Sequence, residues 1–142
     1  MQISTILATK GSKVETIRPD QIVREAVKVL ADKRIGAVVV VDKAGKPIGI
    51  LSERDVIKAL AQDETALGAA VSTIMTSDVI IAQPHDDARA VEKTMTVKRF
   101  RHLPVMERGE LVGIVSIGDV VKATLDAYEG EIETLQTRVE KG

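Results

Sequence analysis

Apolar and polar positions along the first half of the chain predict a fixed order of short strands and amphipathic helices. Apolar residues recur at helical spacing from Pro19-Asp20 to about Lys33, and Gly36 ends this pattern. Residues 37–41 are a continuous run rich in β-branched valine, which is typical of a buried strand. Turn residues then lead to a second strand, and Ser52 begins another helix. The predicted order is β-α-β-β-α, with strands at 14–17, 37–41 and 47–51.

The second half repeats this order. Pro19 matches Pro84, 65 positions later, and after a one-residue deletion Gly49 matches Gly113, 64 positions later. A repeat of this length is a structural unit. The corresponding elements are strands at 79–82, 103–107 and 111–115, a helix at 87–98 and a helix from Ser116. We therefore expect an α/β (α+β) fold of two packed repeats with pseudo-two-fold symmetry and two equivalent clefts.

The duplication also predicts the domain organisation. Repeat 1 is expected at residues 1–65, repeat 2 at 66–127, and a C-terminal helix extension at 128–142. Segment 62–76 joins the repeats without a Pro- or Ser-rich linker, so the halves are expected to pack closely.

Composition excludes several classes of function. The formal net charge is -1 and no long basic run occurs, which argues against binding to nucleic acid. Phe100 and Tyr128 are the only aromatic residues, so a bound base would be sandwiched by aliphatic groups. The chain has no cysteine and no run approaching the roughly 20 apolar residues of a membrane helix. The N-terminus lacks a signal-peptide pattern, so we expect a cytoplasmic protein without a membrane or metal site.

Each repeat carries Ser-x-x-Asp after a glycine-containing strand. Ser52 and Asp55 form the first copy, and Ser116 and Asp119 form the second. One interpretation is a capping box at the start of a helix. The other is a binding site, because a carboxylate can accept hydrogen bonds from both hydroxyls of a ribose while the helix N-terminus favours phosphate.

Basic residues precede the middle strand of the second repeat. Arg99, Arg101 and His102 gather there, where the first repeat has Arg34, Gly36 and Ala37. One interpretation is that these residues contact phosphate. The alternative is that they form a basic edge that faces water. We expect the two clefts to be unequal, with the more basic one containing Asp119.

The duplicated unit resembles the cystathionine-β-synthase (CBS) domain, and the chain resembles a stand-alone bacterial tandem pair, or Bateman module. The segments GAVVVVDKAGKPIGILSERDV and RHLPVMERGELVGIVSIGDVV carry the match. The resemblance implies binding of an adenosine-containing ligand, AMP, ADP, ATP or NAD, between the repeats. It assigns the ribose to Asp119 and Asp55, the hydroxyl partners to Ser116 and Ser52, and phosphate contact to Arg101 and His102.

The resemblance implies two sets of site residues. The expected main cleft contains Lys10, Gly11, Ser12, Lys13, Arg99, Arg101, His102, Ser116 and Asp119. The expected second cleft contains Arg34, Gly36, Ala37, Ser52, Asp55, Thr76, Ser77, Asp78 and Val79.

Three functions remain open. The first is a regulatory nucleotide-binding module without catalysis, acting on an unidentified partner protein. The second is an enzyme, but neither histidine lies in a catalytic motif and no nucleophile–base pair is indicated, so no catalytic residue or cofactor is expected. The third is a scaffold with empty clefts. Apolar residues also recur along the last helix in an a/d pattern, which predicts a homodimer: Val121, Leu125, Tyr128, Ile132, Leu135 and Val139.

Overall fold

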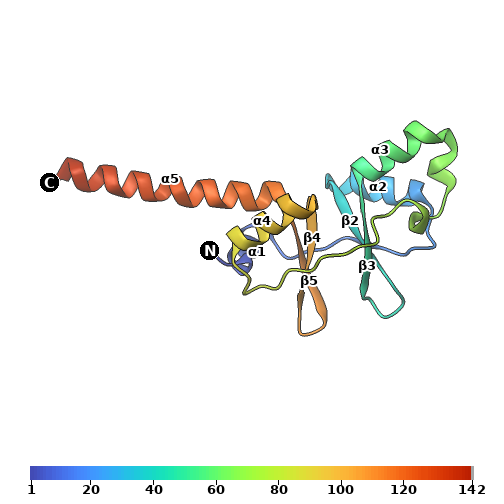
Figure 1. Cartoon of the computed structure of the whole chain (residues 1–142), viewed down its shortest axis with the longest axis horizontal. Helices are drawn as coiled ribbons and strands as arrows, with labels where there is room; N and C mark the ends of the chain where they lie inside the picture. The colour runs from blue at the N-terminus through green and yellow to red at the C-terminus, as the bar shows by residue number, and fades with distance from the viewer. Residues whose placement is uncertain (142) are drawn as a thin grey trace.

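The structure, a computed structural model, describes the backbone of residues 1–141 and the side chains of residues 1–130. Two small sheets stand beside each other, each with its own helices, and one long helix extends away from them (Figure 1). This architecture confirms the predicted α+β class and the C-terminal helix.

The first half contains a three-stranded sheet in the order β1-β2-β3. β1 runs parallel to β2, and β2 runs antiparallel to β3. Every residue of β2 is buried, which explains its unbroken run of apolar side chains. The elements of this half are β1 (Thr16–Ile17), α2 (Val23–Lys33), β2 (Ala37–Val41), β3 (Pro47–Ser52) and α3 (Glu53–Gln62).

The second half contains only a two-stranded sheet, so the strand predicted at 79–82 is wrong. Ala82 forms a single bridge with Val105. In the first half, Val39 donates its N–H to the Glu15 carbonyl at 3.2 Å. Pro104 stands at the place of Val39 and has no N–H to donate, so pairing cannot extend. The elements are α4 (Ala88–Lys98), β4 (His102–Glu107), β5 (Glu110–Ser116) and α5 (Ile117–Lys141).

An arginine with a left-handed backbone conformation follows helix α2 in the first half and helix α4 in the second. Arg34 follows α2 with φ 54°, and Arg99 follows α4 with φ 62°. The predicted end of this helix at about Lys33 is confirmed, and Arg34 rather than Gly36 makes the turn that follows it. A non-glycine residue in this region is uncommon, and here the same backbone turn occurs at both equivalent positions.

The two halves exchange the segments that precede their first strands. Helix α1 (Ile3–Lys10), which the sequence did not predict, packs Ile3, Ile6 and Leu7 into the core of the second half. Conversely, Val71 from the 3₁₀ helix η2 (Val71–Thr73) is fully buried in the core of the first half. The boundary at residue 65 therefore divides the sequence but not the two cores.

Helix α5 is 25 residues long and continues well past the body of the protein (Figure 1). Val121, Leu125 and Tyr128 are 38%, 58% and 57% exposed, so the first part of the expected seam faces outward. Its remaining positions, Ile132, Leu135 and Val139, lie outside the described side chains. No helix in residues 1–141 is long and apolar enough to cross a membrane.

Candidate functional site

A cavity of about 480 Å³ opens at the junction of the two halves. This volume lies in the range typical of small-molecule sites. β3 and α3 supply one wall, and the segments that precede Ala82 and β4 supply the other. The lining residues are Gly36, Ile50, Ser52, Glu53, Arg54, Asp55, Lys58, Thr76, Asp78, Val79, Ile80, Arg99, Phe100, Arg101 and His102.

Asp55 holds the start of α3 and also lines the cavity. Its Oδ2 accepts the Ser52 N–H at 3.0 Å, while Ser52 Oγ accepts the Asp55 N–H at 3.1 Å, which completes a capping box. The Thr76 hydroxyl donates to Asp55 Oδ1 over a long 3.4 Å. The predicted cap is confirmed. Because a carboxylate has about four acceptor positions, Asp55 retains capacity for a ligand.

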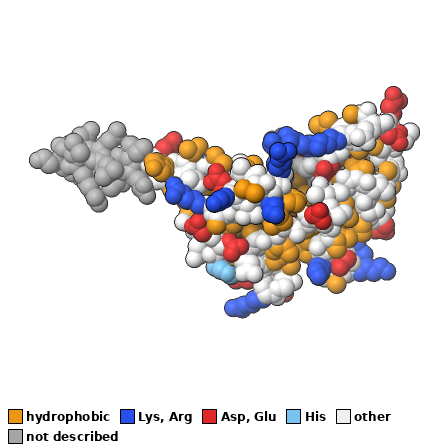
Figure 2. Space-filling view, in the orientation of Figure 1, with side chains coloured by type: hydrophobic (Ala, Val, Ile, Leu, Met, Phe, Trp, Pro, Cys, Tyr) orange, Lys and Arg blue, Asp and Glu red, His pale blue; other side chains and the backbone are white. Residues whose placement is uncertain are grey.

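Four permanently charged or strongly basic side chains line the same cavity. They are Arg54 and Lys58 on α3 and Arg99 and Arg101 before β4. None of them forms an ion pair within residues 1–130. Figure 2 shows Lys and Arg side chains gathered over the junction between α4 and α3. The lining also contains the carboxylates of Glu53, Asp55 and Asp78, so four cations against three carboxylates leave a net charge of +1. Net positive charge in a hollow attracts anions and raises their local concentration.

His102 lies between the two clefts. It lines the Asp55 cavity, yet its charge is also influenced by Lys10 and Asp119. Burial lowers the pKa of His102 below its ordinary value, and the positive charge of Lys10 lowers it further. The imidazole is therefore neutral at pH 7. It offers a hydrogen-bond donor or acceptor to a ligand, while the arginines supply the charge.

The uncharged walls of the cavity suit a flat ring. Ile50, Val79 and Ile80 contribute aliphatic surface, and Phe100 contributes one aromatic face. Phe100 lines the cavity together with its basic neighbours Arg99 and Arg101, so the walls are not purely aliphatic. That aliphatic groups sandwich a bound base stays a prediction.

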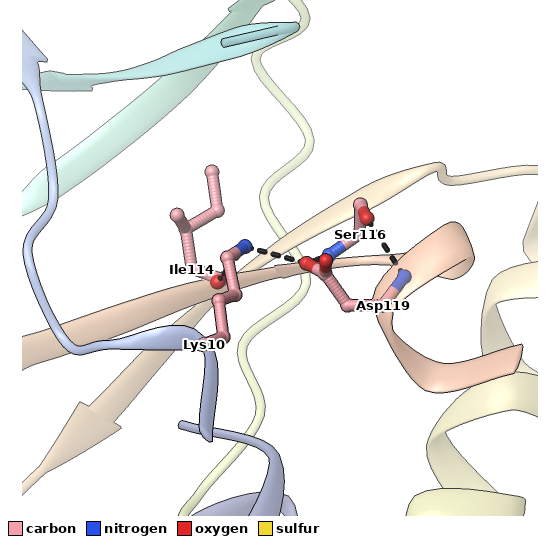
Figure 3. Close-up of polar contacts among 4 residues, drawn as sticks. All are labelled: Lys10, Ile114, Ser116 and Asp119. Atoms are coloured by element: carbon pink, nitrogen blue, oxygen red, sulfur yellow. Dashed lines mark hydrogen bonds and ion pairs between the residues drawn. The ribbon is translucent and has the colours of Figure 1, made fainter. Parts of the chain in front are cut away.

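Asp119 has different partners. It repeats the capping box, since its Oδ2 accepts the Ser116 N–H at 2.8 Å and its N–H donates to Ser116 Oγ at 3.0 Å. In addition, Lys10 Nζ donates to Asp119 Oδ2 at 2.5 Å and to the Ile114 carbonyl at 2.7 Å (Figure 3). Burial raises the pKa of Asp119, but the hydrogen bond and charge of Lys10 and the Ser116 N–H outweigh it, leaving this pKa below its usual value.

The structure groups the predicted site residues differently from the sequence analysis. Arg99, Arg101 and His102 were expected beside Asp119 but line the cavity of Asp55, so the expectation that the Asp119 cleft is the more basic one is wrong. Of the residues expected around Asp55, six do line its cavity, namely Gly36, Ser52, Asp55, Thr76, Asp78 and Val79.

The other predicted residues lie elsewhere. Lys10 and Ser116 contact Asp119, while Lys13 pairs with Glu15 at 3.6 Å. Arg34 is the exposed cap of α2, and Ala37 is buried in β2. Gly11, Ser12 and Ser77 are exposed. A ligand-binding role for any of these residues stays a prediction.

Sequence reasoning missed two basic residues of the cavity. Arg54 and Lys58 lie four positions apart on α3, so they share one face of the helix. Asp55 is adjacent to Arg54 and three residues before Lys58. That spacing places both cations near the carboxylate, and it is the signal that could have identified them.

Comparison with known proteins gives a consistent result. A family model described as "CBS domain" matches twice, at residues 5–62 and 71–126. The crystal structure of a CBS-domain-containing protein from Agrobacterium tumefaciens is 44% identical, with a TM-score of 0.83 over 87% of this chain and 99% of that chain.

Two further similar structures contain adenosine compounds. A CBS domain protein from Pyrobaculum aerophilum, complexed with AMP, is 28% identical, with a TM-score of 0.75 over 84% of this chain and 89% of that chain. A CBS domain pair in complex with 5′-methylthioadenosine and S-adenosyl-L-methionine is 27% identical, with a TM-score of 0.80 over 89% of this chain and 98% of that chain.

Proposed function

Because this chain belongs to the CBS-domain family as a tandem pair, in agreement with the predicted resemblance, we propose that it is a regulatory module that binds an adenine nucleotide in the Asp55 cleft. AMP, ADP, ATP and NAD share the adenosine and phosphate groups that this cleft suits. The bound nucleotide would report its own concentration to an unidentified partner protein.

One observation carries the assignment to this cleft. A carboxylate with free acceptor positions lines the same cavity as four cations that form no ion pair within residues 1–130. Asp55 is suited to the ribose hydroxyls, because a carboxylate accepts from both. Arg54, Arg99 and Arg101 also line an adjoining hollow beside Phe100, so a chain of phosphates has positive charge along its path. Aliphatic side chains and Phe100 offer apolar contact to the base.

The role is proposed as regulatory rather than catalytic. Relatives solved with AMP or S-adenosyl-L-methionine support ligand binding by the fold. The alternative is a scaffold that keeps empty clefts, which the capping role of Asp55 alone would explain. The two functions differ in one measurable property, since a ligand that binds only the folded state raises its stability.

The test is a thermal-shift panel with AMP, ADP, ATP and NAD, followed by calorimetry with the best ligand. Asp55→Asn keeps the size of the side chain and an acceptor for the Ser52 N–H, but removes the charge. We expect the affinity to fall by about 1.5–3 kcal/mol, the range for hydrogen bonds to charged groups. Asp42→Asn is the matched control, because Asp42 caps a turn outside the cavity.

Two results would contradict the proposal. If none of the four nucleotides stabilises the wild-type protein at millimolar concentration, the scaffold function is favoured. If Asp55→Asn lowers the unfolding temperature but leaves the affinity at the wild-type value, Asp55 only caps α3.

A further inference from the structure

Asp55 and Asp119 occupy equivalent positions in the two repeats but have different hydrogen-bond partners. Asp55 Oδ1 receives one long hydrogen bond from a neutral hydroxyl, whereas Asp119 Oδ2 receives the charged ammonium of Lys10. The side chains of Lys10 and Asp119 are only 32% and 27% exposed, so their ion pair is partly shielded from water. Within the described residues, the chain therefore pairs a cation with the Asp119 carboxylate and none with that of Asp55.

The backbone explains why a lysine occupies this position. In the first half, Ile50 and Thr76 form an isolated bridge, and the Thr76 N–H donates to the Ile50 carbonyl at 2.9 Å. In the described part of the chain the equivalent Ile114 carbonyl has no such backbone partner, because the segment that would pair with it belongs to helix α1. Lys10, the last residue of that helix, donates to this carbonyl instead.

This contact fills one of the two carboxylate oxygens that a ribose diol would use, whereas each oxygen of Asp55 keeps a free lone pair. Asp119 Oδ2 already accepts from the Ser116 N–H and from Lys10 Nζ, which accounts for both of its lone pairs (Figure 3). A ribose that needs both carboxylate oxygens can bind only after the ammonium moves away. The positive charge of Lys10 also neutralises the carboxylate that would attract the hydroxyls.

We propose that Lys10 is an internal ligand that masks the Asp119 cleft, so that the chain binds one nucleotide in the Asp55 cleft and its second site opens only when Lys10 is displaced. This inference rests on the proposed function and identifies the residue that makes the two clefts unequal. It replaces the expectation that Lys10 contacts phosphate, because its ammonium already has two oxygen partners.

Calorimetry with AMP tests the proposal in the full-length protein. Wild type should bind one AMP, and Asp55→Asn should weaken this site. Adding Lys10→Met to Asp55→Asn should create a site at least about tenfold tighter than the residual binding of Asp55→Asn, since a hydrogen-bonded charge no longer competes. Adding Asp119→Asn as a third change should abolish the new site.

Two matched variants separate masking from a general effect of charge or folding. Lys13→Met removes a cation from the same segment, but Lys13 is 79% exposed and, within residues 1–130, pairs only with Glu15, so no second site should appear. Lys10→Arg keeps the charge and should keep the site masked. Circular dichroism checks that each variant is folded.

Each outcome decides between named explanations. Two AMP sites of similar affinity in wild type would overturn the masking role while leaving the proposed function intact. A Lys10→Met protein that binds AMP no better than Lys13→Met would do the same, and a loss of affinity would show that Lys10 contacts the ligand. If wild type binds no nucleotide in either cleft, the proposed function itself fails.

Discussion

Gly49 and Thr76 approach each other so closely that a Cβ on Gly49 would lie 3.1 Å from the Thr76 carbonyl oxygen and 2.6 Å from Met75 Sδ. The repeat reproduces this relationship, since a Cβ on Gly113 would lie 2.7 Å from Leu7 Cδ2. The glycine before each Ser-x-x-Asp motif therefore admits the segment exchanged from the other half. In both repeats the chain itself makes this close approach.

Gly49→Ala should destabilise the protein by about 1–3 kcal/mol, the usual cost of overpacking. The Met75 side chain can move, but the Thr76 carbonyl belongs to a paired backbone and cannot move without loss of the Ile50–Thr76 bridge. Urea unfolding measures the change. Gly68→Ala is the control, because no heavy atom lies within 4 Å of its Cβ position. Equal stability of the two variants would contradict the packing argument.

Arg101→Gln should weaken binding of ATP about tenfold while leaving adenosine binding nearly unchanged, because the lost hydrogen bond is to a charged phosphate group. Arg101 lines both the main cavity and the adjoining hollow and has no ion pair in the described part of the chain. Arg89→Gln removes the same charge from an exposed position on α4. Competition calorimetry with ATP and adenosine compares the variants, and a similar loss for both ligands would place Arg101 against the nucleoside.

His102 should make the folded state less stable in mild acid. Burial and the charge of Lys10 hold the pKa of His102 in the folded protein below 6.5, its value in the unfolded chain. At pH values between the two, the unfolded chain binds more protons than the folded protein. The free energy of unfolding therefore rises with pH in this window. The contribution of neutral His102 to stability is fully present above pH 6.5 and is lost as the pH falls through the lowered pKa.

His102→Gln should remove this part of the pH dependence. The measurement is urea unfolding at pH 7.5 and pH 5.5 for wild type, His102→Gln and His85→Gln. Wild type and His85→Gln should lose more stability across this interval than His102→Gln. Identical losses in all three proteins would show that His102 does not titrate with folding.

Local patterns predicted the elements better than they predicted the site. The valine run of β2 and the capping serines act through their own neighbours in the sequence, so their structures could be inferred. Pro104 shows how one residue changes a repeat, because it removes a backbone donor without altering the apolar pattern. The missing strand at 79–82 was nevertheless open to inference from proline chemistry.

The cleft that receives Arg99 and Arg101 could not be inferred in the same way. These residues belong to the second repeat but line the same cavity as Asp55 of the first, because the two halves meet there. No hydrophobic period along the chain encodes which repeat faces which. Helix α1 was not predicted for the same reason, since its apolar residues Ile3, Ile6 and Leu7 are buried by the second half rather than by adjacent sequence.

Leu125→Glu should weaken self-association of the protein. Val121, Leu125 and Tyr128 are spaced four and three residues apart on α5, which places them on one face, and all three are exposed. Exposed apolar residues along a helix that leaves the body favour pairing with a second copy. Sedimentation velocity from 1 to 100 μM should show a dimer for wild type and a shift toward monomer for Leu125→Glu.

Ala127→Glu is the control, because it adds the same charge to another face of α5. The nucleotide affinity should stay unchanged in both variants, since neither position lines the Asp55 cavity. A monomeric wild-type chain across this concentration range would refute the homodimer.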